Sequence, residues 1–364
     1  MTILASSLTR IFVLAAFLAS LAAAQTFTDL VMFNGRNGKD PQAGVVRGSD
    51  GNFYGTTFGG GLPVGQAAGT VFSMTPGGAL TTLYTFFGPT DGSGPAAGLI
   101  QGLDGNFYGT TSSQGPACCG TIFKITPGGS LTTLYAFGSS STDGSTPRAA
   151  LVQDPSGTLY GSTVYGGLHQ SGTIFRITTS GNFQTIYQFG TTRTDGTYPS
   201  GLTLGPDGNL YGATQSGGLY AQGTFFKITP GGSLTTLYHF GTSPNDGSKP
   251  LAAPVLASDG NFYGTTDYGG TSLCGTLFRI SAGGAFATVH QFSCDEANGL
   301  VSPLIQATDG NLYGAALSGF DSTGVVFQMT TAGSLKAIYQ FCQHTACLDG
   351  GYPRGIIQAP DGNL

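Results

Sequence analysis

The stretch that decides the fold reads Asp104-Gly105-Asn106-Phe107-Tyr108-Gly109-Thr110-Thr111. Close or loosened copies of it occupy residues 50–57, 156–163, 207–214, 259–266 and 309–316. The tyrosines of the six copies lie at positions 54, 108, 160, 211, 263 and 313, so the repeat period is 50 to 54 residues. A fixed period of this length predicts one array of structural repeats rather than two or three unrelated domains.

The composition is that of a folded chain rich in turns. The chain has 364 residues, of which 40% are hydrophobic and only 9% are charged, and this is the opposite of a disordered composition. Its 62 glycines recur at fixed offsets, as turn residues do. With 13 Lys and Arg residues and a net charge of -5, the chain offers no basic patch, so we expect no nucleic-acid partner.

Residues 1–24 have the features of a secretory signal peptide. Arg10 is followed by an apolar run over residues 11–21 and by the small residues 22–24. We expect cleavage near Ala24 and a mature repeat domain of residues 25–364 that is secreted or displayed at the cell surface. No later stretch is apolar for long enough to cross a bilayer, so no transmembrane span is expected in the mature chain, which we expect to be a monomer.

One repeat, residues 98–137, reads as four short strands joined by tight turns. The expected strands are residues 99–101, 107–111, 120–126 and 131–137. Asp104-Gly105-Asn106 and Pro127-Gly128-Gly129 are turn sequences of the kind that join antiparallel strands. Four such strands in about fifty residues predict one blade of a β-propeller. A β-solenoid is the structural alternative, but its coils are shorter and lack two hairpin turns per unit.

The number of blades follows from the units and from the chain ends. Complete units are expected at residues 45–86, 98–137, 149–189, 201–240, 253–292 and 302–341. Residues 29–33 match only a fourth strand, and residues 355–364 match only the start of a unit. In a closed ring the N-terminal strand would complete the blade that begins at Gly355 and would remove exposed sheet edges. We therefore expect an all-β, seven-bladed propeller with a truncated C-terminus, about thirty residues short on the repeat period.

The two faces of such a propeller differ in their connections. The first-to-second and third-to-fourth strand turns are short and stereotyped on one face. The connections on the other face are longer and differ between copies; they include residues 58–68, 112–118, 164–170, 215–221 and 342–354. Variable loops on a rigid scaffold are where binding residues usually lie, so this face is the candidate functional surface.

A second motif, Asp-Gly-x-x-Pro, recurs in the loops that join one blade to the next. Its aspartates are Asp91, Asp143, Asp195, Asp246 and Asp349, and they are candidates for ligand binding. A ring of carboxylates near the channel mouth would suit calcium, which takes oxygen ligands. Alternatively each aspartate accepts hydrogen bonds from backbone amides and closes a turn, which is the interpretation that we favour. We assign no metal site and no cofactor.

Loop tyrosines are the other binding candidates. Tyr165, Tyr198, Tyr220, Tyr268 and Tyr352 could stack on sugar rings or other flat ligands, although tyrosines also occur at loop tips that bind nothing. No catalytic residue is assigned, because the four histidines share no spacing with a serine or cysteine nucleophile.

The six cysteines are irregularly placed and lack the paired C-x-x-C spacing of a zinc site. Export permits disulfides. Cys274 and Cys294 both fall on the loop-rich face, so we predict the pair Cys274–Cys294, and we also predict a local pair Cys342–Cys347. The adjacent Cys118 and Cys119 form either a vicinal disulfide or two free thiols.

The combined pattern resembles a known repeat. Gly-Asn-(Phe/Leu)-Tyr-Gly-Thr-Thr, then Gly-Thr-(Val/Ile/Leu)-Phe-(Lys/Arg)-(Ile/Met)-Thr-Pro-Gly-Gly and Leu-x-x-(Leu/Ile)-Tyr-x-Phe, is similar to the GloVer-type repeat of bacterial choice-of-anchor tandem repeat proteins. The resemblance covers essentially the whole mature chain. It implies an exported, propeller-like array whose C-terminal anchor varies, and it implies no established activity. The chain departs at Ser156-Gly157-Thr158, where the Asp-Gly-Asn turn is replaced, and it shows no anchor.

A weaker resemblance links the chain to the sensor propellers of two-component regulators and to streptogramin-lyase-like propellers, whose Asp-Gly-Asn-Leu-Trp motif carries tryptophan where this chain has tyrosine. The sequence therefore predicts an exported, non-catalytic scaffold that binds an extracellular glycan or protein through the loop-rich face. The alternatives are a propeller enzyme, either a lyase or a glycoside hydrolase, and a structural cell-surface protein without a small ligand.

Overall fold

Each repeat folds into one sheet because its two turn motifs reverse the chain at fixed places. In the computed structural model, Gly102 N donates to Asn106 O at 2.8 Å and Thr126 N donates to Ser130 O at 3.0 Å, which closes the two hairpins of one repeat. The second residue of the first turn, Gly105, has a φ of 80°, a left-handed conformation that favours glycine. The structure describes residues 27–63, 67–319, 323–342 and 350–364; the predicted signal peptide, residues 1–24, lies outside them.

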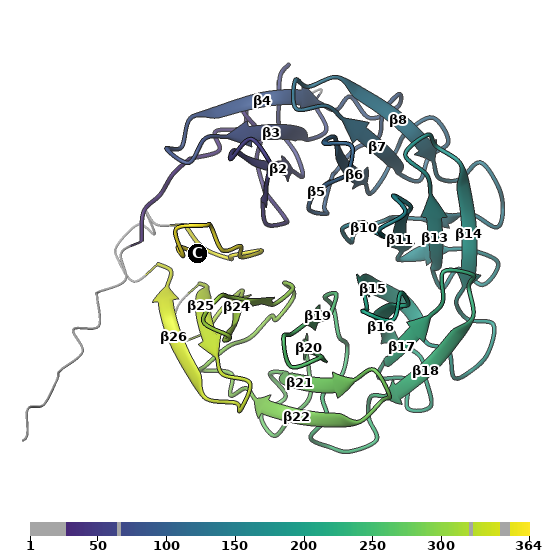
Figure 1. Ribbon diagram of the computed structural model, residues 1–364, viewed down its shortest axis with the longest axis vertical. Coiled ribbons are helices and arrows are strands. Elements are labelled where there is room, and N and C mark those ends of the chain that lie inside the picture. Colours follow the sequence, from purple (N-terminus) through teal and green to yellow (C-terminus); the bar gives the residue numbers. More distant parts are fainter. Residues whose placement is uncertain (1–26, 64–66, 320–322, 343–349) are drawn as a thin grey trace, which may run out of the picture.

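The described strands form six four-stranded antiparallel sheets, blades 1 to 6, arranged in a ring, and no helix is present among the described residues (Figure 1). Blade 1 has β1 (Val46–Arg47), β2 (Phe53–Thr57), β3 (Thr70–Met74) and β4 (Leu80–Thr85), and blade 2 has β5 (Ile100–Gln101), β6 (Phe107–Thr111), β7 (Thr121–Ile125) and β8 (Leu131–Ala136). Blade 3 has β10 (Val152–Gln153), β11 (Leu159–Thr163), β13 (Thr173–Ile177) and β14 (Phe183–Gln188), and blade 4 has β15 (Thr197–Leu204), β16 (Leu210–Ser216), β17 (Thr224–Ile228) and β18 (Leu234–His239). Blade 5 has β19 (Val255–Leu256), β20 (Asn261–Thr266), β21 (Thr276–Ser281) and β22 (Phe286–Gln291), and blade 6 has β23 (Ile305–Gln306), β24 (Leu312–Ala316), β25 (Val325–Met329) and β26 (Leu335–Gln340). The strands β9 (Gly144–Ser145) and β12 (Tyr165–Gly166) form a separate two-stranded sheet. The predicted all-β propeller fold is confirmed.

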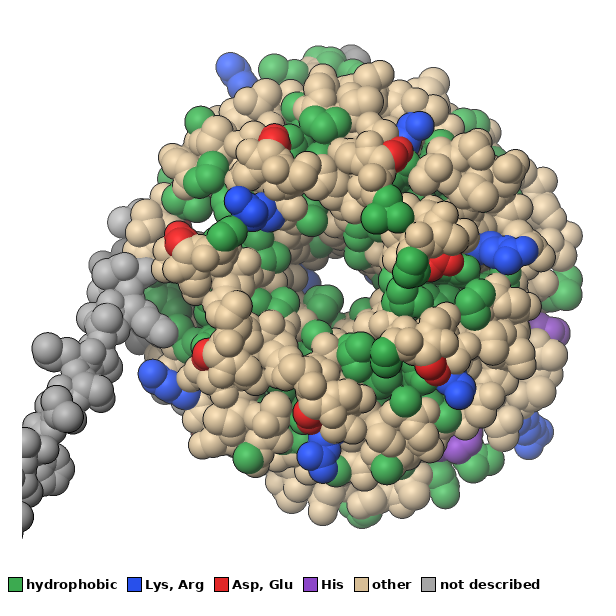
Figure 2. Space-filling view, in the orientation of Figure 1, with side chains coloured by type: hydrophobic (Ala, Val, Ile, Leu, Met, Phe, Trp, Pro, Cys, Tyr) green, Lys and Arg blue, Asp and Glu red, His purple; other side chains and the backbone are tan. Residues whose placement is uncertain are grey.

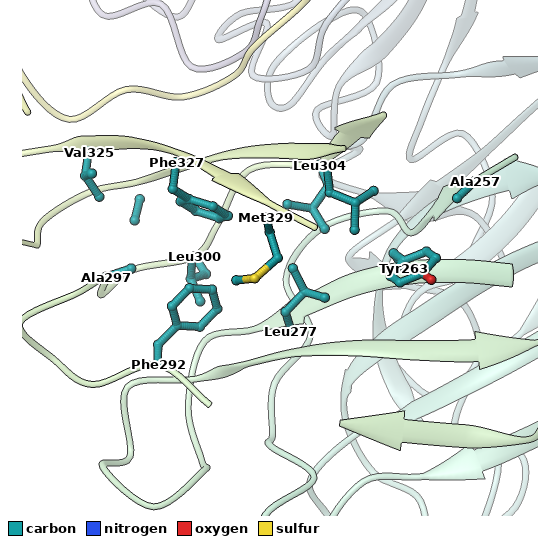
Figure 3. Close-up of a cluster of buried hydrophobic side chains, with 12 residues drawn as sticks. Ala257, Tyr263, Leu277, Phe292, Ala297, Leu300, Leu304, Val325, Phe327 and Met329 are labelled. Carbon is teal, nitrogen blue, oxygen red and sulfur yellow. The ribbon is translucent and has the colours of Figure 1, made fainter. Parts of the chain in front are cut away.

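The hydrophobic core lies between neighbouring blades. Phe292, which follows β22 of blade 5, packs against Phe327 of blade 6 with ring centroids 5.5 Å apart, and both side chains are buried (Figure 3). The same contact joins Phe86 to Phe123 between blades 1 and 2, at 5.2 Å. Because each blade repeats this contact with the next, the core is a ring of similar interfaces rather than one central cluster.

The two ends of the described chain lie in the gap between blade 6 and blade 1 (Figure 1). Phe27 stacks on Tyr339 of blade 6 at 4.4 Å, and Phe33 meets Phe72 of blade 1 at 5.3 Å, the geometry that fourth-strand residues have elsewhere. Near the other end, Thr308 N of blade 6 donates to Gln358 Oε1 at 2.8 Å, as Ser49 N donates to Gln101 Oε1 between blades 1 and 2. Six complete blades are described where the sequence predicted seven, and the remaining position in the ring holds these two end segments.

Within the described ranges there is no helix that is both long and apolar enough to cross a membrane.

Candidate binding face

The two faces of the ring are built from different connections. The face that carries the short hairpin turns is called the turn face, and the face that carries the second-to-third and blade-to-blade connections is called the loop face. Figure 2 shows the ring from one side, with a central opening and with acidic side chains spaced around it. Each face has its own recurring pair of an aspartate and a tyrosine, and these pairs explain both sequence motifs.

On the turn face, the Asp-Gly-Asn-x-Tyr motif is a self-contained hydrogen-bond network. Asp104 accepts hydrogen bonds from the backbone and side-chain nitrogens of Asn106, and the buried Tyr108 donates its hydroxyl to Asp104 Oδ2 at 2.8 Å. Partial burial raises the pKa of Asp104, but the hydrogen bonds from Asn106 and Tyr108 outweigh it, so that the pKa lies below its ordinary value. In blade 1, burial and the hydrogen bond to Asp50 raise the pKa of Tyr54 to about 12.

The divergent turn of blade 3 keeps this network by another route. Asp154 stands two positions before Ser156, and its Oδ1 accepts the backbone N–H groups of Ser156 and Thr158, both at 2.9 Å. Tyr160 donates its hydroxyl to the other oxygen of Asp154 at 3.2 Å. The turn that the sequence analysis described as replaced therefore retains an aspartate–tyrosine pair, and the acidic residue two positions upstream was the clue to it.

On the loop face, the four described aspartates of Asp-Gly-x-x-Pro, Asp91, Asp143, Asp195 and Asp246, are buried and accept hydrogen bonds within their own loops. Asp91 is 5% exposed; it accepts the hydroxyl of Tyr84 at 2.8 Å and the backbone N–H groups of Phe87 and Gly88 at 3.0 Å. Burial and the hydrogen bond to Asp91 raise the pKa of Tyr84 to about 12. The same tyrosine–aspartate contact recurs in the next three blades, as Tyr135–Asp143, Tyr187–Asp195 and Tyr238–Asp246.

Asp195 differs from its counterparts in one oxygen. Its Oδ2 accepts the hydroxyl of Tyr187 and the N–H of Thr191, whereas its buried Oδ1 has no hydrogen-bond partner. Tyr187 and Thr191 also line an open surface cavity of about 300 Å³, together with His169 and Gln188. Asp349, the fifth aspartate of the motif, lies outside the described residues. Among the residues that are described, no three His, Cys, Asp or Glu side chains come together as metal ligands.

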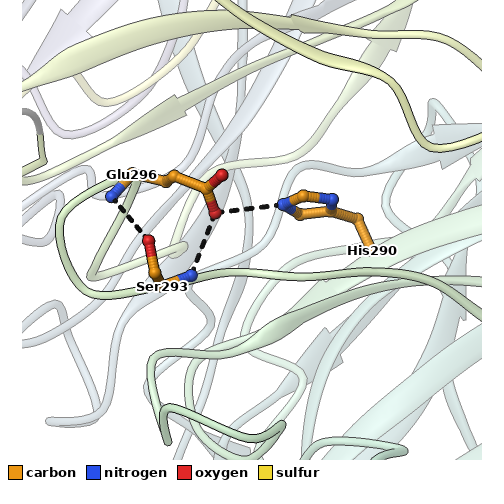
Figure 4. Close-up of polar contacts among 3 residues, drawn as sticks. All are labelled: His290, Ser293 and Glu296. Atoms are coloured by element: carbon orange, nitrogen blue, oxygen red, sulfur yellow. Dashed lines mark hydrogen bonds and ion pairs between the residues drawn. The ribbon is translucent and has the colours of Figure 1, made fainter.

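The loop between blades 5 and 6 carries a substitute pair that the sequence analysis did not identify. His290 stands where the other outer strands have tyrosine, and its Nε2 lies 3.2 Å from Glu296 Oε2 (Figure 4). Glu296 also accepts the backbone N–H of Ser293 at 3.0 Å. Partial burial raises the pKa of Glu296, but the hydrogen bonds from Ser293 and His290 outweigh it and hold the pKa below its ordinary value. This pair does not match the Asp-Gly-x-x-Pro motif, because both residue types and the spacing between them differ from those of the other blades.

The candidate tyrosines lie on the loop face with their rings partly in solvent. Tyr165, Tyr220 and Tyr268 are each close to half exposed, and Tyr198 is partly buried. The rings of Tyr165 and Tyr198 meet edge to face with centroids 5.4 Å apart. Lys249 Nζ lies 4.7 Å from the centroid of the Tyr268 ring, a cation–π contact. Tyr352, near the C-terminal end, is exposed.

Exposed large hydrophobic side chains are concentrated on the loop face. Fourteen are found among the described residues, and nine of them lie on this face: Leu62, Phe87, Tyr165, Leu168, Leu219, Tyr220, Tyr268, Leu273 and Tyr352. Four others belong to the end segments, and Leu103 is the only one in a turn of the opposite face.

Two disulfides lie in the connections of the loop face. Cys274, which precedes β21, is bonded to Cys294, which follows β22, in the pairing that the sequence analysis predicted. Cys118 and Cys119 form a vicinal disulfide in the connection before β7, which selects one of the two alternatives left open. The predicted Cys342–Cys347 bond involves Cys347, which lies outside the described residues.

Solved structures similar to this chain include propellers with different tasks. A virginiamycin B lyase from Staphylococcus aureus is 16% identical with a TM-score of 0.60, and the match covers 87% of this chain and 88% of the lyase. A streptogramin B lyase is 18% identical with a TM-score of 0.59 and 89% of each chain covered. The extracellular domain of a putative hybrid two-component system from B. thetaiotaomicron is 12% identical with a TM-score of 0.60, over 89% of this chain and 36% of that one. At these identities the likeness shows the fold alone.

The sequence itself matches a family of repeats. No curated protein matches it. The Gloeobacter/Verrucomicrobia repeat, in contrast, matches residues 17–205 and 191–364, which together span nearly the whole chain. This match confirms the resemblance to the GloVer-type repeat, and the chain therefore belongs to the Gloeobacter/Verrucomicrobia repeat family.

Proposed function

We propose that this protein is an exported binding scaffold that recognises an extracellular glycan or protein through its loop face without catalysing a reaction. The observation that carries the proposal is the placement of nine of the fourteen exposed large hydrophobic side chains on that face. Exposed apolar and aromatic groups that gather on one surface mark interaction sites, whereas scattered ones need no explanation.

The frame beneath these side chains supports the proposal. The buried aspartates of the loop face are held by tyrosine hydroxyls and backbone amides, and the Cys274–Cys294 bond ties two connections together. A rigid frame reduces the entropy that is lost on binding, because the loops do not have to be ordered by the partner. The contact residues of the proposal are therefore the tyrosines and leucines of the face rather than the motif aspartates.

Export is part of the proposal. Disulfides persist in oxidising compartments outside the cytosol, and the described part of the chain contains the two bonds Cys118–Cys119 and Cys274–Cys294. The apolar run at residues 11–21 supports the same placement.

The test compares the two faces in one binding assay. Purified mature protein is incubated with intact producing cells and with their sedimented cell envelopes, and the retained fraction is measured. The loop-face variant carries Leu168→Ser and Leu219→Ser, and the matched turn-face control carries Leu103→Ser; all three leucines are more than 60% exposed. We expect the wild type and the control to be retained and the loop-face variant to be released.

Two results would overturn the proposal. Equal retention of both variants would place the interaction elsewhere, and no retention of the wild type would leave the face without a partner at the producing cell. A separate assay addresses the enzyme alternative: turnover of an offered glycan by the wild type, lost in Asp195→Asn, would replace the binding function with a catalytic one.

A further inference from the structure

The connections that lead into the blades hold one residue in the same left-handed conformation around the ring; for blade 4 this residue, Tyr198, is the second residue of β15. These residues, here called the left-handed ring, are Asp40 (φ 56°), Gly94 (φ 62°), Thr146 (φ 58°), Tyr198 (φ 60°), Lys249 (φ 53°), Gly299 (φ 73°) and Tyr352 (φ 54°). In six of the seven loops a proline follows this residue, and in the loop of Gly299 the next residue is Leu300. The backbone is thus constant while the side chain differs from blade to blade.

Backbone hydrogen bonds to two blades fix this conformation. Lys249 N donates to Gln222 O of blade 4 at 3.0 Å, and Lys249 O accepts the N–H of Asp267 from blade 5 at 3.1 Å. Gly94 makes the corresponding pair of bonds at the junction of blades 1 and 2, to Ala68 O and from Ser112 N. Both bonds use main-chain atoms, so the frame at this position does not depend on which side chain is present.

Tyrosine and lysine are unfavourable choices for such a position. A left-handed conformation disfavours residues with a Cβ atom, and bulky side chains are rarer there than glycine. Gly94 and Gly299 occupy the same place in two loops, so glycine can adopt the backbone conformation that this position requires. Side chains that are kept in a disfavoured conformation, where glycine would serve, point to a role outside the fold.

Two members of the ring contact tyrosines that project from neighbouring connections. Tyr198 meets Tyr165 edge to face at 5.4 Å, and Lys249 lies over Tyr268 at 4.7 Å. Tyr165 and Tyr268 occupy equivalent places, since each pairs with the serine of an Asp-Gly-Ser sequence, Ser145 and Ser248. The pair Tyr165–Tyr198 lies at the junction of blades 3 and 4 and the pair Lys249–Tyr268 at the junction of blades 4 and 5; the two pairs together are here called the aromatic arc.

The middle of the arc is polar. Gln215 and Ser216 of blade 4 stand at the places that correspond to Val164 and Tyr165 of blade 3. A protein partner would favour a continuous apolar centre, whereas here the amide of Gln215 and the hydroxyl of Ser216 belong to the blade between the two aromatic pairs. A pyranose ring has the matching chemistry, with an apolar C–H face and an edge of hydroxyls.

We propose that the aromatic arc binds a carbohydrate chain, with tyrosine rings stacked on pyranose faces and Lys249 donating to a hydroxyl or a carboxylate of a neighbouring sugar. The inference rests on the proposed function of the loop face and names its ligand class. Tyrosine suits this task because it offers a large rigid surface with a polar tip and loses little side-chain entropy.

The experiment measures affinity and thermal stability in the same variants. Isothermal titration calorimetry uses two kinds of hexasaccharide as probes: neutral ones (cellohexaose, xylohexaose and chitohexaose) and one acidic one (hexagalacturonate). The variants are Tyr198→Gly and Lys249→Gly, and the matched control is Asp40→Gly, which changes the corresponding left-handed residue in the segment that leads into blade 1, away from the arc.

We expect at least one hexasaccharide to bind the wild type and the Asp40→Gly control equally. Tyr198→Gly should weaken that binding about tenfold or more, as expected for an aromatic anchor. Lys249→Gly should weaken the acidic probe more than the neutral ones. The melting temperatures of all three variants should stay within about 2 °C of the wild type or rise, because glycine relieves the backbone at this position.

Three results would overturn the inference. If no hexasaccharide binds while the wild type is still retained on cell envelopes, the ligand class is wrong although the loop face still binds. If Tyr198→Gly binds as tightly as the wild type, the arc is not the site. If Tyr198→Gly lowers the melting temperature well below that of Asp40→Gly without a loss of affinity, the tyrosine has a structural role only.

Discussion

The loop between blades 4 and 5 and the loop between blades 5 and 6 each place a carboxylate against a side chain of the preceding outer strand, but with different residues. In the first, Tyr238 donates its hydroxyl to Asp246 at 2.6 Å. In the second, His290 and Glu296 make the corresponding contact at 3.2 Å. Asp246 lies six residues after the buried Phe240, whereas Glu296 lies four residues after Phe292, so the longer carboxylate accompanies the shorter loop.

The residues that pack beneath these two carboxylates, in the following blade, also differ. Beneath Asp246, Gly247 rests on a buried pair of hydroxyls, Thr266 and Thr276, which are 2.9 Å apart. Beneath Glu296 the equivalent residues are Ala297, Ala316 and Val325: an alanine replaces the glycine and two apolar residues replace the threonines. Residues that contact one another therefore differ together between these two repeats, as expected where neighbouring side chains are energetically coupled.

The largest effect is expected for Gly247→Ala. Gly247 has a φ of 81°, and an added Cβ would collide with Thr266 Oγ1 and Thr276 Oγ1. We expect a loss of about 3 kcal/mol in the free energy of unfolding, measured by chemical denaturation. The control is the triple change Gly247→Ala, Thr266→Ala and Thr276→Val, which copies blade 6 and should recover part of that loss. If the triple variant is less stable than the single one, the residues do not vary as a set.

The next effect concerns the tyrosine–aspartate pair. Tyr238→Phe removes the hydroxyl that Asp246 accepts and leaves a carboxylate, 2% exposed, with fewer donors. We expect a loss of about 2 kcal/mol in the free energy of unfolding at neutral pH. Tyr220→Phe, in which the ring is half exposed, is the matched control and should change stability little. Equal effects of the two variants would show that the hydroxyl of Tyr238 does not stabilise the loop.

The two loops should also lose their contributions to the free energy of unfolding at opposite ends of the pH scale. Burial and the hydrogen bond to Asp246 raise the pKa of Tyr238, so its contribution is present below the ordinary tyrosine pKa and is lost as the pH rises through the higher folded value. The pKa of Glu296 is lowered, so its contribution is present above the ordinary glutamate pKa and is lost as the pH falls through the lower folded value.

Glu296→Gln tests the acidic half of this comparison. We expect it to cost up to about 1 kcal/mol at neutral pH, since the pair is partly exposed. The difference from the wild type should shrink as the pH falls below about 4. Denaturation at a series of pH values measures both, and a difference that grows on acidification would contradict the assigned sign.

The smallest effect on stability is expected when the turn residues of blade 3 are replaced together by the turn residues of the other blades. Asp154→Ala alone should cost about 1 kcal/mol, because Ser156, Thr158 and Tyr160 all donate to this carboxylate. The triple change Asp154→Gly, Ser156→Asp and Thr158→Asn installs the turn of the other blades and should bring stability back to within about 0.5 kcal/mol of the wild type. Thermal denaturation of the three proteins checks whether the two turns are interchangeable.

The sequence predicted the parts of the fold that are periodic. The tyrosines at a nearly constant step and the two glycine turns identified four-stranded blades, and shared location on one face identified Cys274 and Cys294 as partners. The pair His290–Glu296 could not be predicted from the motif, because a motif fixes both the residue types and their spacing. The contact itself requires only that the loop and the side chain together be long enough. The left-handed ring escaped for a related reason: its members share a backbone conformation and no residue type.

The segment of residues 27–33 has a consequence for folding cooperativity. In an open array of repeats the first and last units have one neighbour each, so the array frays from its ends. Here Phe27 contacts blade 6 and Phe33 contacts blade 1, so the terminal units are joined by one stretch of chain. Amide protons of blades 1 and 6 should then exchange with solvent as slowly as those of blade 3, and the ring should open as one unit.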